Sequence, residues 1–431
     1  MINLKKTHLH KLLRSKLFAV LVIAFTMRIV FAFLVWHPDV TNHIDWGNRL
    51  YQYLPKGFYS PDANVWNFTW PNQPPGTIYM FGIIKYMFDI VFAILLFVNN
   101  SISLFPSIIV SFSESNLYPA MLKLPAIIAD FGIAYIFFNL LKKQNNKLAI
   151  ATSVLFVLLP VIWYNSSVWG QYDSVINFLF LAGFYFADKK QSLLSVICIA
   201  VSLYIKISLL ILLPVYIVFL LRKNSLTKIV VSSVIGFLLI MVLTVPFSYT
   251  QNPIAWLYKI YTEKVLSEQL HVITANAFNF WSIFVGVEWI SNSLPLLGKT
   301  YEFWGYVLFA IVSIPLYLKA LFTKKIDKTL FLSGMIYFAA WLFLTNMHER
   351  YLFPFFVFSL TYIVKNKMSL TLYILASLLS LFNMYYLWFK PEIEILITFS
   401  ELVNKSAIGI LFVCIFLYFY KNALFNKKLE S

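Results

Sequence analysis

Long apolar segments recur along the whole chain, many of them close to the ~20 residues with which a helix crosses a bilayer. Hydrophobic residues make up 60% of the 431 positions, and charged residues only 12%. A water-soluble fold of this composition would expose large apolar patches and aggregate. The sequence therefore predicts an all-α polytopic membrane protein whose helices lie in a lipid bilayer.

The charged residues separate the apolar segments from one another. Lys and Arg number 34 against 18 Asp and Glu, which gives a formal net charge of +16. Because the basic residues do not form a stripe on a soluble domain, nucleic acid is not an expected partner. Cys198 and Cys414 lie inside apolar segments and indicate neither a disulfide framework nor a thiolate metal site.

The first apolar segment follows a basic N-terminal stretch, as in a secretion signal. No small-residue cleavage site comes after it, which favours a retained signal-anchor helix. We expect about twelve transmembrane helices, within a range of about ten to fourteen. Their predicted ranges are 17–36, 119–141, 147–164, 173–187, 191–206, 207–221, 227–247, 302–321, 329–345, 351–364, 369–388 and 405–421.

The distribution of basic residues predicts the topology. The connections on one side of this arrangement hold most of the Lys and Arg, which marks that side as cytoplasmic and places both termini there. Residues 37 to 118 then form a large first external loop with interfacial or re-entrant helices. Alternatively, residues 78–98 and 102–112 form a transmembrane pair. No linker or repeat divides the chain, so residues 1 to 431 are expected to form a single domain, in a bacterial plasma (inner) membrane.

Six polar and aromatic segments fall on the predicted external side. Together they contain carboxylates, cations, a histidine and many aromatic rings, which are the groups that an active site needs. The segments are TNHIDW (41–46), WPNQPPG (70–76), WGQYD (169–173), Lys206, NAFNFWS (276–282) and MHERY (347–351).

The residue types limit the chemistry at this face. The sequence has no glycine-rich phosphate loop, HExxH motif or paired Cys/His spacing, so nucleotide and zinc sites are not expected. Carboxylates beside Arg, Lys and His are suited to activating a hydroxyl group and stabilising a phosphate leaving group. A sugar linked to a lipid phosphate would supply such a substrate. This pattern requires no cofactor, and it leaves a divalent metal open.

A set of short motifs occurs in a definite order. The chain carries Asp45, WPNQPPGTIY, KLPAIIAD, YIKIS, NAFNFWS and MHERYLFP, within residues 20 to 360. Each motif alone is unspecific, but the ordered set resembles the GT-C-fold membrane glycosyltransferases. Among these it is most similar to the polyprenyl- or dolichyl-phosphate-glucose-dependent glucosyltransferases of the N-glycan pathway and their bacterial relatives. Those enzymes tend to have Asn near Asp173, Gln in place of Ile207 and Lys in place of Arg350, which leaves the sugar and the acceptor open.

The resemblance implies roles for individual residues. Asp45 would be the catalytic carboxylate, and Asp173 a second catalytic or acceptor-orienting one. Lys206, His348 and Arg350 would bind the donor phosphate and neutralise its developing charge. The expected substrate-binding residues are His43, Trp70, Gln73, Trp169, Gln171, Asn279, Trp281 and Glu349.

The same residues also have structural interpretations. On this interpretation, Asp45 is a solvated loop carboxylate or a helix cap, and Asp173 caps the helix that begins beside it. Lys206, Glu349 and Arg350 then hold their charges at the membrane interface. The tryptophans belong to an interfacial aromatic belt.

The resemblance implies an inverting hexosyltransferase, glucosyl or mannosyl, that acts on the external face. The donor would be a polyprenyl-phosphate-linked sugar, and the acceptor a hydroxyl group of a glycan, lipid or protein. Two other classes remain: a transporter or flippase of lipid-linked sugars, and a polysaccharide polymerase or ligase. The long external loop and the lack of an inverted repeat favour the transferase over the transporter.

Two charges lie deep inside predicted helices. Arg28 is far from both ends of the first, and Asp130 is equally far inside the second. At 1.5 Å per residue, each is about 16–18 Å from the membrane surface. Because an unpaired charge at that depth is expensive, the sequence predicts a buried ion pair that fixes the packing of these two helices.

Overall fold

The computed structural model describes residues 16–60, 71–267 and 269–425, with side chains from residue 18 onward. The chain is 78% helical and has almost no strands in these ranges. The described strands are β1 (Pro295–Leu296) and β2 (Lys299–Thr300), which pair antiparallel with Pro295 opposite Thr300. The protein is therefore an α-helical membrane protein, as predicted.

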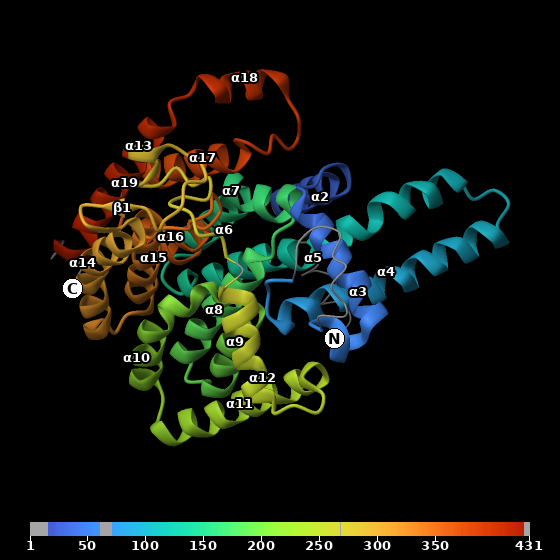
Figure 1. The fold of residues 1–431 in the computed structure, drawn as a ribbon, viewed down its shortest axis with the longest axis horizontal. Helices are drawn as coiled ribbons and strands as arrows, with labels where there is room; N and C mark the ends of the chain where they lie inside the picture. The colour runs from blue at the N-terminus through green and yellow to red at the C-terminus, as the bar shows by residue number, and fades with distance from the viewer. Residues whose placement is uncertain (1–15, 61–70, 268, 426–431) are drawn as a thin grey trace.

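Helices far apart in the sequence pack into one bundle (Figure 1). In chain order they are α2 (Lys16–Leu34), α3 (Asp39–Phe58), α4 (Pro75–Ser101), α5 (Ser107–Leu141), α6 (Asn146–Leu158), α7 (Pro160–Trp163), the π-helix η2 (Tyr164–Trp169), α8 (Asp173–Asp188), α9 (Ser192–Ile205), the 3₁₀ helix η3 (Ile207–Leu212), α10 (Leu213–Lys223), α11 (Leu226–Ser248), α12 (Pro253–Ile260), the π-helix η4 (Tyr261–Leu266), α13 (Ser282–Val285), α14 (Tyr301–Phe322), α15 (Ile326–Phe343), α16 (Phe353–Lys365), α17 (Leu370–Tyr385), α18 (Glu394–Leu402) and α19 (Lys405–Phe425).

The prediction of about twelve transmembrane spans is wrong. Among the described helices, six are long and apolar enough to cross a membrane, or up to eight spans if each of two bent pairs is one span. The six are α4, α5, α11, α14, α15 and α19. The helices α8, α9, α10, α16 and α17 occur where the sequence predicts helices, but they have only 11 to 16 residues. At 1.5 Å per residue they reach at most about 24 Å, which is less than the ~30 Å hydrocarbon core.

The predicted first loop is largely helical. It contains α3, which bends by 78° from α2, and α4, which is itself a candidate span. The segment 102–112 is not a separate helix, because α5 begins at Ser107 and continues for 35 residues to Leu141. Figure 1 shows α4 and the first half of α5 projecting from the bundle as a hairpin.

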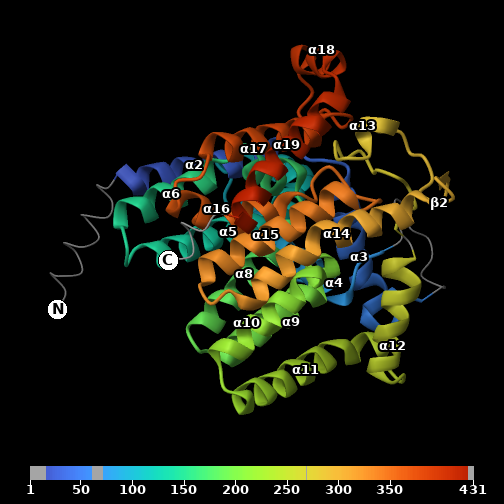
Figure 2. The same cartoon turned by 90° about the vertical axis from the view of Figure 1, so that its left-hand side faces the viewer.

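The centre of the bundle is formed by α15 and α16. Every side chain of α15 from Thr329 to Phe343 is buried, and so is α16 from Phe353 to Ile363. α15 packs against α14, α16 and α19, and α16 packs against α6 and α8. Figure 2 shows α11, α14 and α15 running in roughly the same direction, with α12, α13 and β2 at one end. This packing fixes the loop of residues 344 to 352 between α15 and α16.

The predicted deep ion pair is confirmed. Arg28 Nε lies 3.1 Å from Asp130 Oδ2, and both side chains are fully buried. Arg28 also donates to the carbonyl oxygen of Val157 at 2.8 Å. Asp130 accepts hydrogen bonds from the hydroxyl groups of Ser166 and Ser174 at 2.7 and 2.6 Å. The pair therefore joins α2 and α5 to η2 and α8, the two elements beside WGQYD.

Candidate functional site

Two adjoining cavities lie where the six polar segments meet. Cavity 1 has a volume of about 450 Å³ and cavity 2 of about 320 Å³, which is the size range of small-molecule sites. The residues that line both are Asn72, Gln73, Lys206, Gln269 and Tyr351. A ligand group beside these residues is within reach of both cavities.

Cavity 2 is polar and takes wall residues from all six segments. One residue from each is Asn42, Gln73, Gln171, Lys206, Asn276 and His348. The structure therefore brings together segments that are up to about three hundred residues apart in the sequence.

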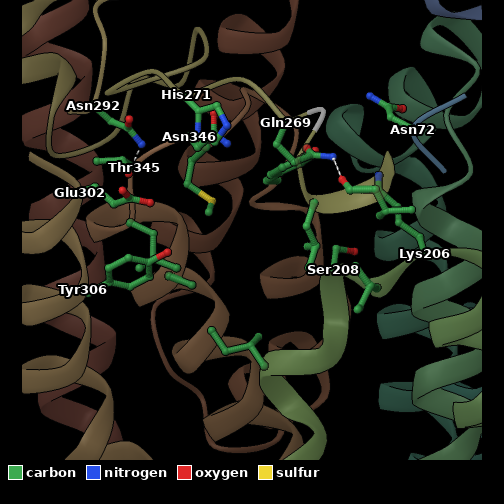
Figure 3. A pocket seen from close by; sticks show the side chains of 18 of the residues that line it. Asn72, Lys206, Ser208, Gln269, His271, Asn292, Glu302, Tyr306, Thr345 and Asn346 are labelled. Carbon is green, nitrogen blue, oxygen red and sulfur yellow. Dashed lines mark hydrogen bonds between the residues drawn. The ribbon is translucent and has the colours of Figure 1, made fainter. Parts of the chain in front are cut away.

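Cavity 1 combines polar and apolar walls. Figure 3 shows Asn72 and Lys206 on one side of it, and Asn292, Glu302 and Tyr306 on the other. The apolar lining side chains are Ile207, Ile211, Val265, Leu266, Ala340 and Leu344. A cavity with this lining fits an amphiphilic ligand, with its polar group near Lys206.

Four charged side chains alternate in sign across the junction. Lys206 Nζ donates to Asp173 Oδ1 at 2.8 Å. Asp173 Oδ2 lies 3.8 Å from Arg350 Nε, and Arg350 Nη1 lies 3.7 Å from Asp39 Oδ2. Because each cation faces a carboxylate, both cations are held in position at the cavities without an anionic ligand.

Breaks in the helices place these charges. α9 ends at Ile205, and Lys206 is extended (φ −154°, ψ 127°) before η3 begins. Asp173 is the first residue of α8 and follows Gly170, whose φ of +80° is a conformation that glycine adopts readily. The N-cap position of α8 belongs to Tyr172, so the capping interpretation of Asp173 is not what the structure has. Its carboxylate contacts the two cations instead.

Asp39 is the site residue that the sequence interpretation missed. It begins α3 and lines cavity 2. Its Oδ2 accepts hydrogen bonds from Trp169 Nε1 at 3.0 Å and from Gln171 Nε2 at 2.6 Å. Its Oδ1 lies 3.4 Å from Nδ1 of His37. These donors and the nearby Arg350 favour the ionised carboxylate.

Asp45, the predicted catalytic carboxylate, lines neither cavity. Both of its oxygens lie 3.0 to 3.1 Å from Nε of Arg49, one helical turn further along α3. Asp39 and Asp45 are six residues apart, which is about 240° around a helix. They therefore leave α3 in different directions, and only Asp39 reaches the cavity wall. A catalytic role for Asp45 stays a prediction.

Most of the other predicted residues lie at or just behind cavity 2. His43, Gln73 and Gln171 line it, as does Glu349, which is only 1% exposed. Trp169 is fully buried, and its indole faces Asp39 rather than the cavity. It is thus placed to orient the carboxylate, not to stack on a sugar.

Asn279 and Trp281 are not brought to the cavities. The side-chain amide of Asn279 donates to the carbonyl oxygen of Trp341 at 3.1 Å. The indole of Trp281 donates to the carbonyl oxygen of Phe343 at 2.8 Å. These two hydrogen bonds hold the NAFNFWS segment against the C-terminal end of α15. Trp70 lies outside the described residues.

Several buried polar atoms around cavity 2 have no hydrogen-bond partner in the described part of the chain. They include Oδ1 of Asn42 and Nδ1 of His43, which both line cavity 2. Buried polar groups in native proteins are almost always hydrogen-bonded. These atoms are available to hydrogen-bonding groups of a ligand in cavity 2.

Two neighbouring residues of the 344–352 loop have shifted pKa values. Burial, together with the positive charge of Arg350, lowers the pKa of His348 to about 3. Burial raises the pKa of Glu349 to about 7, against the opposing effect of Arg350. At neutral pH His348 is therefore an uncharged imidazole. It can donate a hydrogen bond to a phosphate, but it does not supply the positive charge that the sequence interpretation assigned to it.

No group of three or more His, Cys, Asp and Glu side chains in the described residues is arranged to hold a metal ion. The carboxylates of Asp39 and Asp173 pair with Arg350 and Lys206, and Glu302 and Glu349 line different cavities. The sequence matches no protein-family model and no curated protein. Any conclusion about function therefore depends on the motifs and on the geometry of the two cavities.

Proposed function

We propose that the protein is a GT-C-type inverting glycosyltransferase that moves a hexose from polyprenyl phosphate to an acceptor hydroxyl. The observation that carries this proposal is the junction of an amphiphilic cavity and a polar cavity at Lys206. A lipid-linked sugar needs apolar walls for its chain, a cation for its phosphate and a polar space for its sugar. Cavity 1 and cavity 2 supply these three features side by side.

The donor phosphate would lie between Lys206 and Arg350. Both side chains reach cavity 2, and both face Asp173, so little rearrangement is needed to form charge-assisted hydrogen bonds to phosphate oxygens. His348, as a neutral imidazole, would add one hydrogen bond. As the bond to the sugar breaks, these groups stabilise the negative charge that develops on the leaving phosphate.

Asp39 would act as the general base, because its carboxylate borders cavity 2. The acceptor hydroxyl gives its proton to Asp39 while its oxygen attacks the anomeric carbon. The bond between this carbon and the phosphate oxygen breaks, and its electron pair leaves with the phosphate. Attack from the face opposite the phosphate inverts the configuration. Trp169 and Gln171 donate to Oδ2 of Asp39 and so hold the carboxylate in position at the cavity wall.

The proposed orientation follows the positive-inside rule. The cavities then face the outside of a bacterial plasma membrane, and both termini are cytoplasmic. Polyprenyl-phosphate sugars would reach cavity 1 from the bilayer, and the acceptor would reach cavity 2 from the aqueous side.

The test is transfer of label by the purified protein in nanodiscs. Radiolabelled polyprenyl-phosphate hexoses are incubated with a membrane extract as the source of acceptor. Asp39→Asn should still bind the donor, but transfer should fall by roughly 10²- to 10⁴-fold, as is typical of losing a general base. Asp45→Asn is the matched control on the same helix and should retain most of its activity.

Other outcomes separate the alternatives. Loss of transfer in Asp45→Asn but not in Asp39→Asn would return the catalytic role to the carboxylate that the sequence indicates. If both variants and the wild type transfer nothing, but proteoliposomes move the intact labelled lipid between leaflets, the protein is a flippase.

A further inference from the structure

A third cavity, of about 420 Å³, is lined by Val168, the residue before Trp169. Its walls come from α2, α7, η2, α17 and the connection between α17 and α19. We call this connection, residues 386 to 404, the strap; it contains α18. The lining side chains include Phe31, Val168, Leu378, Leu381, Phe382 and Phe399.

The two tyrosine hydroxyl groups in this lining already donate hydrogen bonds. The hydroxyl of Tyr164 donates to the carbonyl oxygen of Lys390 at 2.5 Å. The hydroxyl of Tyr385 donates to the carbonyl oxygen of Pro391 at 2.9 Å. Both bonds tie the strap to the bundle and leave hydrocarbon on the inner surface. A water molecule there would find too few hydrogen-bond partners, whereas an apolar chain would need none.

The surface around this cavity is also apolar. On α2, Leu34 is 64% exposed, and on α17, Leu378 is 47% exposed. On α18, Ile395 and Leu402 are 76% and 80% exposed. Figures 1 and 2 show α18 standing away from the other helices. In a membrane protein such a surface is covered by bilayer chains, so the cavity is continuous with the lipid-facing surface.

The strap also borders the candidate active site. Trp388 lines cavity 2, whereas Pro391 and Ile393, only a few residues later, line the third cavity. The ring centroids of Trp388 and His37 are 4.1 Å apart, those of His37 and Trp169 are also 4.1 Å apart, and those of Trp169 and Trp388 are 6.3 Å apart, so the three rings form one cluster. His37 and Trp169 are 1% and 0% exposed, so this aromatic wall separates the two cavities.

We propose that the third cavity binds one hydrocarbon chain of a bilayer phospholipid, and that this chain supports the strap that carries Trp388. The aromatic wall argues against the chain of a substrate whose head group occupies cavity 2, because that substrate would have to pass through it. The phospholipid head group would remain at the membrane surface beside α18, with its chain between α17 and the strap.

Photolabelling in nanodiscs tests this site. The probe is phosphatidylglycerol with a diazirine on its acyl chain, and labelled peptides are mapped by mass spectrometry. Labels should concentrate in α17 and α18. Leu381→Trp, from α17, and Leu396→Trp, from the strap, each fill the cavity and should reduce this labelling several-fold. Val242→Trp is the control, because Val242 is 66% exposed on α11 and lines none of the three cavities.

The outcome that overturns the proposal is equal labelling of α17 and α18 in the wild type and in both cavity-filling variants. Labelling that excess polyprenyl phosphate removes, but excess unlabelled phosphatidylglycerol does not, would assign the cavity to a substrate chain and would also overturn it. Leu396→Trp lies on the strap at 43% exposure, so it tests the cavity even if Leu381→Trp fails to fold. Neither result depends on glycosyl transfer.

Discussion

Replacing Arg28 by methionine should destabilise the protein by about 3–5 kcal/mol, the typical cost of removing one partner of a buried ion pair. The methionine fills much of the space but leaves the carboxylate of Asp130 fully buried without its cation. Ser166 and Ser174 remain as hydrogen-bond donors to Asp130, which limits the loss. The lost bond from Arg28 to the carbonyl oxygen of Val157 adds about 1 kcal/mol.

A second substitution separates the charge from the packing. Asp130→Asn removes the negative charge but keeps an oxygen that accepts from Ser166 and Ser174. The Arg28→Met/Asp130→Asn double variant should therefore recover most of the stability that Arg28→Met loses. The free energy of unfolding is measured by SDS titration in mixed micelles, with helix content followed by circular dichroism. If the double variant is as unstable as Arg28→Met, the uncompensated charge is not the cause of the loss, and the reasoning is refuted.

Three further outcomes follow from the structure. In the folded protein Glu349 has a pKa of about 7, above the ordinary value of 4.5, so it keeps its proton where the unfolded chain has lost it. The free energy of unfolding should therefore fall as pH rises from about 5 to 7. Glu349→Gln should remove this dependence on pH. Gly170→Ala should destabilise the protein by over ~1 kcal/mol in chemical denaturation, since φ is +80° and a Cβ would lie 2.5 Å from Val40 Cγ2. An impermeant thiol reagent should label a cysteine at position 346, but not one at position 224, in intact cells.

The positions of most of the apolar helices could be predicted, because each is an apolar run with polar ends. The number of spans could not, because short helices that are buried inside the bundle, such as α16, are as apolar as the helices that face lipid. Hydropathy measures composition, whereas a span also needs length. The predicted helix 119–141 also missed the first part of α5, which begins at Ser107 and contains both Pro119 and Pro125.

The site was predicted as a set of segments, but not as a set of contacts. A signal for the Lys206–Asp173 pair was present: α8 begins at Asp173 and α9 ends beside Lys206, so an antiparallel hairpin brings both charges to one end. The choice between Asp39 and Asp45 needed the side-chain directions on α3. The spacing of Asp45 and Arg49 at i and i+4 is itself typical of an ion pair along a helix, and the structure has this pair buried.

Lys123 on α5 is fully buried, and its ammonium group is held by backbone carbonyl oxygens and not by a carboxylate. Lys123 Nζ donates to the carbonyl oxygens of Ala32, Val35 and Ser167 at 3.2, 2.5 and 3.0 Å. These carbonyls belong to the C-terminal ends of α2 and η2, where a helix dipole favours a cation. The segments that leave these two ends carry Asp39 and its two hydrogen-bond donors. Lys123 therefore joins, inside the bundle, the two backbones whose side chains meet at cavity 2, so the position of the proposed base is set by the core and not by a surface loop.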